Sequence, residues 1–127
     1  MLGEHPINVV LLATDLESSK EFYAGKLGLE ILEESEAAIT YKCGGDSQLA
    51  VTKSTTGTAD EQTQAGWRVD DLDAEVAELR ARGVEIQEYD MPEMGLKTVD
   101  GIADVGFARM AWIIDPHKNA LAIMQVK

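Results

Sequence analysis

Two stretches of the chain repeat the same order of hydrophobic and polar positions. They begin at residues 14 and 70 and read TDLESSKEFYAGKLGLEI and DDLDAEVAELRARGVEI. Asp15 aligns with Asp71 at an offset of 56 residues, and Gly28 aligns with Gly83 at an offset of 55. A repeat of this kind indicates that one structural module occurs twice along the chain.

Each copy predicts a strand followed by a helix. The apolar runs VVLLAT (9–14) and GWRV (66–69) have the length and composition of strands. Asp15 follows the first run, and Asp70 or Asp71 follows the second. An aspartate at this place accepts a hydrogen bond from an exposed amide of the first helical turn, so we expect both helices to begin there.

Each predicted helix has one apolar face and a glycine at its end. Hydrophobic residues recur at helical spacing and form a stripe that we expect to be buried: Leu16, Phe22, Tyr23 and Leu27 in the first helix, and Leu72, Val76 and Leu79 in the second. Gly28 and Gly83 fit helix C-termini, because glycine adopts the left-handed conformation at little cost.

Three strand candidates follow each helix. They are LEILEES (29–35), AITYKC (38–43) and QLAVTK (48–53) in the first copy, and VEIQEY (84–89), ARMAWII (108–114) and ALAIMQV (120–126) in the second. Turn residues at 43–46 and 115–119 predict hairpins. The glycine-containing segment 91–107 has no clear period, and we expect a long, mobile loop beside a site there.

The pattern predicts one domain made of two modules. Module one covers about residues 5–53, a small polar linker about 54–63, and module two about 64–127. Each module has the order strand, helix, strand, strand, strand. A chain of 127 residues is long enough for one domain with a core, so we expect residues 1–127 to form a single domain of the α+β class.

Charge and cysteine content narrow the range of partners. The chain has 23 acidic and 11 basic residues, a formal net charge of −12, which repels nucleic acid and anionic membrane surfaces and favours a cationic ligand. No apolar run approaches the roughly 20 residues of a membrane span. The single cysteine, Cys43, leaves no disulfide framework, and the segment MLGEHPINVVLL lacks the features of a secretory signal, so we expect a cytoplasmic protein.

The doubled module, the entry VDDLDAEVAELRARGVEI and the closing hairpin IIDPHKNALAIMQ together resemble the vicinal oxygen chelate superfamily, which contains glyoxalase I, extradiol dioxygenases and the bleomycin resistance proteins. The resemblance covers about residues 7–125. It implies a glyoxalase/bleomycin resistance/dioxygenase-like fold, in which two βαβββ modules form curved mixed sheets around a cavity. We also expect a homodimer, because each module leaves sheet edges that a second copy can cover.

Metal-using members of this superfamily take a histidine from the first strand of each module and a glutamate from the last. The resemblance places these positions at Asn8, Gln64, Ala122 and Ala50 in this sequence. Two amides and two alanines lack the imidazole and carboxylate donors that catalytic divalent ions take, so we expect no metal and no cofactor at this place. Whether the chain is an enzyme stays open at this point.

Alternation along the strands predicts which side chains share a face with those positions. The expected ligand-binding residues are Asn8, Val10 and Leu12, Gln64 and Arg68, Met110, Trp112 and Ile114, and Met124. They make a mostly apolar lining with a few polar groups, although the apolar members fit a closed core equally well. Arg68 has a second interpretation as the partner of a surface acid, and Trp67, of opposite parity, is expected to pack against a helix.

Three functions are compatible with these features. The first is metal-independent binding or sequestration of a small aromatic or cationic molecule in the apolar cavity, as in bleomycin resistance proteins. The second is a lyase, isomerase or dioxygenase with a non-standard metal site, for which the available replacements are His5, His117, Asp104 and Glu93. The third is a dimeric interaction subunit. We expect His117, in its Asp-Pro turn, to be a solvated residue that does not reach the cavity.

Overall fold

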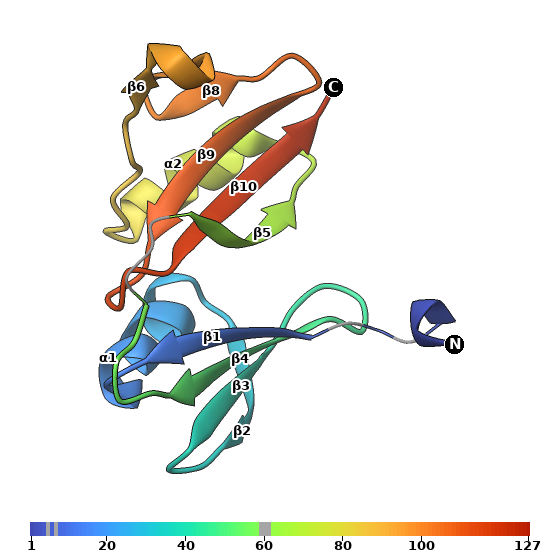
Figure 1. Cartoon of the computed structure of the whole chain (residues 1–127), viewed down its shortest axis with the longest axis vertical. Helices are drawn as coiled ribbons and strands as arrows, with labels where there is room; N and C mark the ends of the chain where they lie inside the picture. The colour runs from blue at the N-terminus through green and yellow to red at the C-terminus, as the bar shows by residue number, and fades with distance from the viewer. Residues whose placement is uncertain (5, 7, 59–61) are drawn as a thin grey trace. The chain divides into compact units, whose positions relative to one another are not determined.

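The computed structural model describes residues 1–4, 6, 8–58 and 62–127. By its internal contacts the chain divides into two compact units, residues 1–60 with 115–119, and residues 61–114 with 120–127. The turn at 115–119 therefore groups with the first unit, although the strands on either side of it belong to the second (Figure 1).

The first unit is a four-stranded mixed sheet with one helical segment. Its elements are η1 (Leu2–Glu4), β1 (Val9–Ala13), α1 (Leu16–Lys20), the π-helix η2 (Glu21–Lys26), β2 (Glu30–Glu34), β3 (Ala38–Lys42) and β4 (Gln48–Lys53). The strand order is β1-β4-β3-β2, with β1 parallel to β4 and the other neighbours antiparallel.

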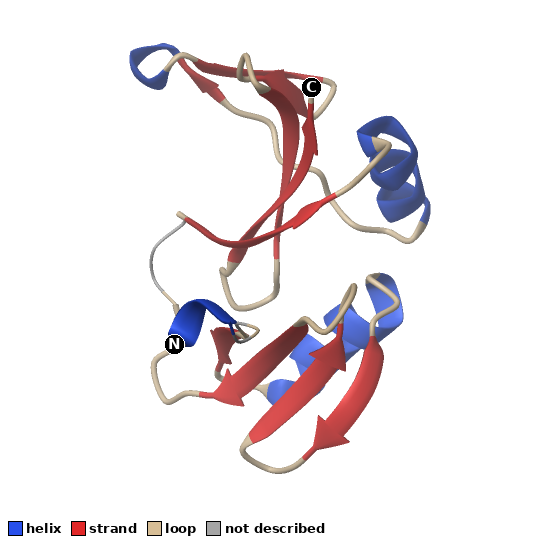
Figure 2. Ribbon diagram, turned by 90° about the vertical axis from the view of Figure 1, so that its right-hand side faces the viewer, coloured by secondary structure: helices blue, strands red, loops and turns tan. Residues whose placement is uncertain are grey.

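The second unit repeats this topology and extends it. Its elements are β5 (Thr63–Arg68), α2 (Leu72–Ala81), β6 (Asp90–Met91), the short helix η3 (Pro92–Met94), β7 (Leu96–Val99), β8 (Ile102–Asp104), β9 (Ala108–Ile114) and β10 (Ala120–Val126). The strand order is β5-β10-β9-β8-β7-β6, with β5 parallel to β10. Two mixed sheets, each with helix on one face, confirm the predicted α+β class (Figure 2).

Both helices begin and end at the predicted residues. The Asp15 side chain accepts a hydrogen bond from the Glu17 amide at 3.0 Å, and the Asp71 side chain accepts one from the Ala74 amide at 3.1 Å. After the helices, Gly28 and Gly83 have φ angles of 73° and 81°, in the left-handed region. The first helix differs from the prediction in its second half, where the hydrogen bonding is that of a π-helix.

Strand alternation separates a helix-covered face from an open face in the first unit. Leu11 and Ala13 of β1 are buried, whereas Val10 and Leu12 are 58% and 37% exposed. Tyr23, which follows α1, is fully buried.

No helix of the described residues is long and apolar enough to cross a membrane.

The structures predicted for two segments of the second unit were wrong. Residues 84–89, predicted as a strand, belong to no strand of the structure. The strand that occupies this place in the topology is β8, which pairs with β9. The segment 91–107, predicted as a mobile loop, contains β7, β8 and the tight turn that joins them. Residues 84–89 are held by isolated hydrogen bonds instead. In one of these the Gln87 amide donates to the Trp112 carbonyl at 2.9 Å.

Candidate functional site

The turn at 115–119 is fixed by the buried side chain of Asp115. Its Oδ1 accepts hydrogen bonds from the backbone amides of His117 and Asn119, each at 2.8 Å. Its Oδ2 accepts from the Tyr23 hydroxyl and from Asn119 Nδ2, each at 2.7 Å. Burial and the nearby Asp115 raise the pKa of Tyr23, so its hydroxyl remains a donor. Asp115 therefore organises the turn and attaches it to the helical segment of the first unit.

Asn119 extends this network to the sheet of the first unit. Its Nδ2 also donates to the Leu12 carbonyl of β1 at 2.8 Å, and its Oδ1 accepts from the Thr58 hydroxyl at 2.9 Å. Asn119 is fully buried, so each of these bonds satisfies a group that water does not reach. The Asp-Pro-x-x-Asn pattern of the turn thus has a structural explanation that requires no ligand.

His117 is held by the beginning of α1. Its Nε2 lies 2.9 Å from the Asp15 carbonyl and 2.8 Å from the Ser18 hydroxyl, and its Nδ1 lies 3.4 Å from the Thr14 amide. A carbonyl only accepts and an amide only donates, so the network assigns the imidazole proton to Nε2. Nε2 then cannot take a proton from Ser18. His117 is partly exposed, and its ring is in addition hydrogen-bonded to the beginning of α1. With the proton on Nε2, the geometry does not support a catalytic base.

The other proposed replacement ligands do not meet. Asp104 forms an ion pair with Lys127 at 2.6 Å, which together with the Gly106 amide lowers the pKa of Asp104. Glu93 lies exposed in η3, and His5 is outside the described residues. Across the part of the chain that the structure describes, no cluster of three or more His, Cys, Asp or Glu side chains has the arrangement of a metal site.

The family's four metal-ligand positions carry the wrong donors in their folded setting as well. The register pairs Val10 with Ala50 and Gly66 with Ala122, so the two alanines occupy equivalent places in the two units. The Gln64 amide oxygen accepts a hydrogen bond from the Ala120 amide at 3.3 Å, at an irregularity in the pairing of β5 with β10. These residues do not fit a divalent ion.

The open face of the second sheet collects most of the predicted ligand-binding residues. One row across three strands runs Gly66, Ala122, Trp112, and the next row runs Arg68, Met124, Met110. Gly66 and Arg68 on the edge strand β5 are exposed. Ile114 lies two residues beyond Trp112 and pairs with Ala120. Asn8, Val10 and Leu12 are exposed in the first unit.

Trp112 is held in position within a small apolar cluster. It is 9% exposed and packs with Ala103 and Ala122, and the partly buried members around it are Tyr89, Leu96, Val105 and Met110. Its Nε1 donates to the Thr63 hydroxyl at 3.1 Å, and its ring meets that of Tyr89 edge to face at 5.7 Å. No residue of α2 belongs to this cluster, so the indole lies on the face away from the helix.

Sequence reasoning missed Tyr89 and Thr63 as neighbours of Trp112. Tyr89 was predicted to lie in a strand, whereas it lies outside the strands and bonds through its backbone to Thr98. Thr63 enters the face because the register of β5 against β10 shifts between Ala120 and Leu121. Strict alternation cannot predict such a shift, since a bulge moves one residue out of step.

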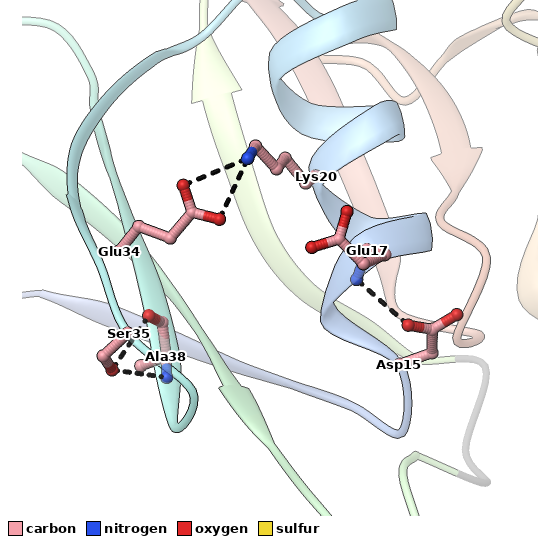
Figure 3. A network of polar contacts seen from close by, with 6 residues as sticks. All are labelled: Asp15, Glu17, Lys20, Glu34, Ser35 and Ala38. Atoms are coloured by element: carbon pink, nitrogen blue, oxygen red, sulfur yellow. Dashed lines mark hydrogen bonds and ion pairs between the residues drawn. The ribbon is translucent and has the colours of Figure 1, made fainter.

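One hollow in the first unit has several acidic side chains in its lining. This hollow of about 740 Å³ is lined by Thr14, Asp15, Leu16, Glu17, Glu34, Ser35, Glu36, Ile39 and Lys53. Two of its carboxyl groups already have partners, because Asp15 caps the helix and Glu34 pairs with Lys20 at 2.9 Å (Figure 3). The hydrogen bond with Glu34 raises the pKa of Lys20. This hollow is a solvated, partly self-neutralised surface.

Tyr23 and Tyr41 provide a matched test of the turn network. Both are fully buried, with ring centroids 5.5 Å apart, but the Tyr41 hydroxyl bonds to none of the residues that the structure describes. We expect Tyr23→Phe to lower the free energy of unfolding by about 1 to 3 kcal/mol, because Asp115 loses a donor. Tyr41→Phe should leave it unchanged or raise it by up to about 1 kcal/mol. Urea unfolding measures both, and equal losses would contradict the assignment.

Comparison with solved structures supports the fold. The antibiotic binding protein TnmS3 from Streptomyces sp. CB03234 superposes with a TM-score of 0.71 at 23% identity, covering 97% of this chain and 96% of that one. A glyoxalase/bleomycin resistance protein/dioxygenase from Alicyclobacillus acidocaldarius gives 0.71 at 21% identity, covering 96% and 91%. Lactoylglutathione lyase from Agrobacterium tumefaciens gives 0.68 at 18% identity, covering 94% and 91%.

Comparison of the sequence gives one family and no individual relative. The model of the Glyoxalase/Bleomycin resistance protein/Dioxygenase superfamily matches residues 6–123. No curated protein matches the chain.

Proposed function

Because this chain belongs to the Glyoxalase/Bleomycin resistance protein/Dioxygenase superfamily, we propose that it binds a small aromatic molecule on the open face of its second sheet without metal and without turnover. The observation that carries this proposal is the row Gly66, Ala122, Trp112. Gly66 is exposed on the edge strand, whereas Ala122 and Trp112 are 4% and 9% exposed, so two small residues and the margin of a fixed indole stand where metal-using relatives need a carboxylate. The antibiotic binding protein among the similar structures supports binding as a function of this fold.

The surroundings of Trp112 suit the recognition of a ring. The indole is held by its bond to Thr63 and by the edge of Tyr89, so little side-chain freedom is lost when a ligand arrives. The adjacent residues Met110 and Met124 have flexible, polarizable side chains that adapt to an apolar ligand. The single cysteine and the absence of a disulfide framework agree with a cytoplasmic setting.

The test of this function uses 2-naphthamide, a neutral aromatic probe, and isothermal titration calorimetry. We expect saturable binding by the wild-type protein and a loss of roughly two- to tenfold in affinity for Trp112→Phe, because stacking on the indole is weakened. Trp67→Phe is the matched control. Trp67 pairs with Ile123 and so lies on the opposite face of the sheet from Trp112. The Trp67→Phe variant should therefore bind 2-naphthamide with the affinity of the wild type.

Two results would contradict the proposal. One is the absence of any binding of 2-naphthamide, and the other is an equal effect of Trp112→Phe and Trp67→Phe. Metal analysis of protein purified without chelator gives an independent check, because a stoichiometric divalent ion would favour an enzyme with a non-standard site.

We further propose that the protein is a homodimer. The first unit exposes Val10 and Leu12 on its open face and Leu32 on its edge strand β2. Exposed apolar side chains next to an unpaired strand edge are the features that association between copies removes from water. Light scattering at micromolar concentration should give twice the mass of one chain. The mass of a single chain would rule the dimer out.

A further inference from the structure

The charged residues on the strands of the second unit are divided unequally between its two faces. They are Arg68, Asp90, Lys97, Asp104 and Arg109. Asp90 pairs with Lys97, and Asp104 pairs with Arg109, in the register of the sheet. Thr98, Ala103 and Met110 form the alternate row, which continues to Met124 and Arg68. By this register, four of the five charged residues lie on the helix face and only Arg68 shares the face of Trp112.

The charges on the helix face neutralise one another. Arg109 donates two hydrogen bonds of 2.9 Å to Asp73 of α2, and these bonds raise the pKa of Arg109 and lower that of Asp73. Asp104 pairs with Lys127. Lys97 and Asp100 line the same hollow as Asp73 and Arg109. An incoming ion therefore finds both signs of charge on this face.

Arg68 differs from these residues because it has no acidic partner among the residues that the structure describes. It is exposed, and its guanidinium makes no ion pair or side-chain hydrogen bond within the ranges 1–4, 6, 8–58 and 62–127. In a chain with 23 acidic residues, the surface-acid interpretation of Arg68 is thereby excluded for the described residues. A guanidinium binds a carboxylate with two parallel hydrogen bonds, which fixes orientation as well as charge.

The distance between Arg68 and Trp112 suits one ligand that contacts both. The two residues are separated by two strand spacings across β10 and by two residues along the strand. At about 4.8 Å per strand and about 3.3 Å per residue, their Cα atoms lie about 12 Å apart. The line between them crosses β10 between Ala122, which adds no bulk, and Met124, whose flexible side chain can adapt to a ligand. A ring system that reaches toward the indole thus places a carboxyl substituent within range of the arginine.

We propose that the ligand of this face is an aromatic carboxylate, with its ring against Trp112 and its carboxylate on Arg68. This inference rests on the proposed function and names its ligand class. It runs against the protein's formal charge of −12, which favours cations at long range. Contact at a few ångströms decides the outcome, because the whole-protein field is screened over about 10 Å at 0.1 M salt whereas a bidentate pair is not.

The test compares three probes of one shape by calorimetry: 2-naphthoate, 2-naphthamide and 2-naphthylmethylammonium. We expect the carboxylate to bind roughly tenfold more tightly than the amide, and the ammonium to bind no better than the amide. Arg68→Gln should abolish the preference for the carboxylate over the amide. Arg82→Gln removes an equal charge from the exposed surface of α2 and should preserve the preference.

The outcomes separate the two proposals. If the amide binds in a Trp112-dependent way but the three probes have equal affinities, or the ammonium binds most tightly, the carboxylate inference is overturned and the binding function stands. If the preference survives in Arg68→Gln, the carboxylate is recognised elsewhere and the inference is overturned. If none of the three probes binds, the binding function and the inference fall together.

Discussion

Asp115→Ala is expected to lower the free energy of unfolding by about 4 kcal/mol, the largest effect of any single side chain discussed for this protein. The change removes the acceptor of four hydrogen bonds at once. Two of the orphaned donors are on Asn119, which is fully buried and cannot turn to water. Small domains have total stabilities of about 5 to 15 kcal/mol, so this loss removes a large fraction of the stability and should lower the urea midpoint of the variant.

Urea unfolding followed by circular dichroism measures this effect. Asp46→Ala is the matched control, because Asp46 also lies in a hairpin turn but is exposed. It should change the free energy of unfolding by no more than about 0.5 kcal/mol. A loss below about 1 kcal/mol in Asp115→Ala would show that the turn is not fixed through this side chain.

The helices and the hairpin strands were predictable because their signals are local. Asp15 and Asp71 cap helices through bonds to amides two and three residues away. The strands β9 and β10 coincide with the predicted segments 108–114 and 120–126, since continuous β-branched and apolar runs bounded by a turn leave no competing pattern. In these elements the residues that decide the structure are neighbours in the chain.

The environment of His117 could not be predicted, because its partners Thr14, Asp15 and Ser18 are about a hundred residues away in the sequence. The lack of an ion-pair partner for Arg68 among the described residues is of the same kind, since it depends on which of those acids fold onto the other face. The parity rule placed Arg68 and Trp112 on one face, but that they bind a ligand stays a prediction.

The turn between β7 and β8 was different, because its signal was present and was overlooked. Asp100 and Gly101 have φ angles of 53° and 84° and separate two paired strands by two residues. Asp-Gly between short strands is a strong indication of a two-residue hairpin with positive φ at both positions. The surrounding glycines and the shortness of the two strands give the segment 91–107 no clear period, which is also typical of a loop.

Gly101→Ala is the second variant with a large expected effect, a loss of about 3 kcal/mol in the free energy of unfolding. At a φ of 84° any side chain is strained, and a Cβ here would lie 2.6 Å from Ile86 Cγ2 and 2.9 Å from the Arg80 guanidinium. Ile86 is buried and cannot move aside without disturbing its neighbours. Gly83→Ala is the matched control, because its φ of 81° is almost the same but no atom lies within 4 Å of the added Cβ.

The difference between these two variants isolates the cost of the clash, and it bears on the candidate site. Gly83→Ala should lose only about 1 to 2 kcal/mol, the cost of the left-handed backbone alone. The β7–β8 hairpin also carries Leu96 and Ala103, which pack around Trp112. In a Trp67→Phe background, Gly101→Ala should therefore shift the emission of Trp112 to longer wavelength, whereas Gly83→Ala should not. Equal stability losses with unchanged emission would mean that the hairpin does not support the indole.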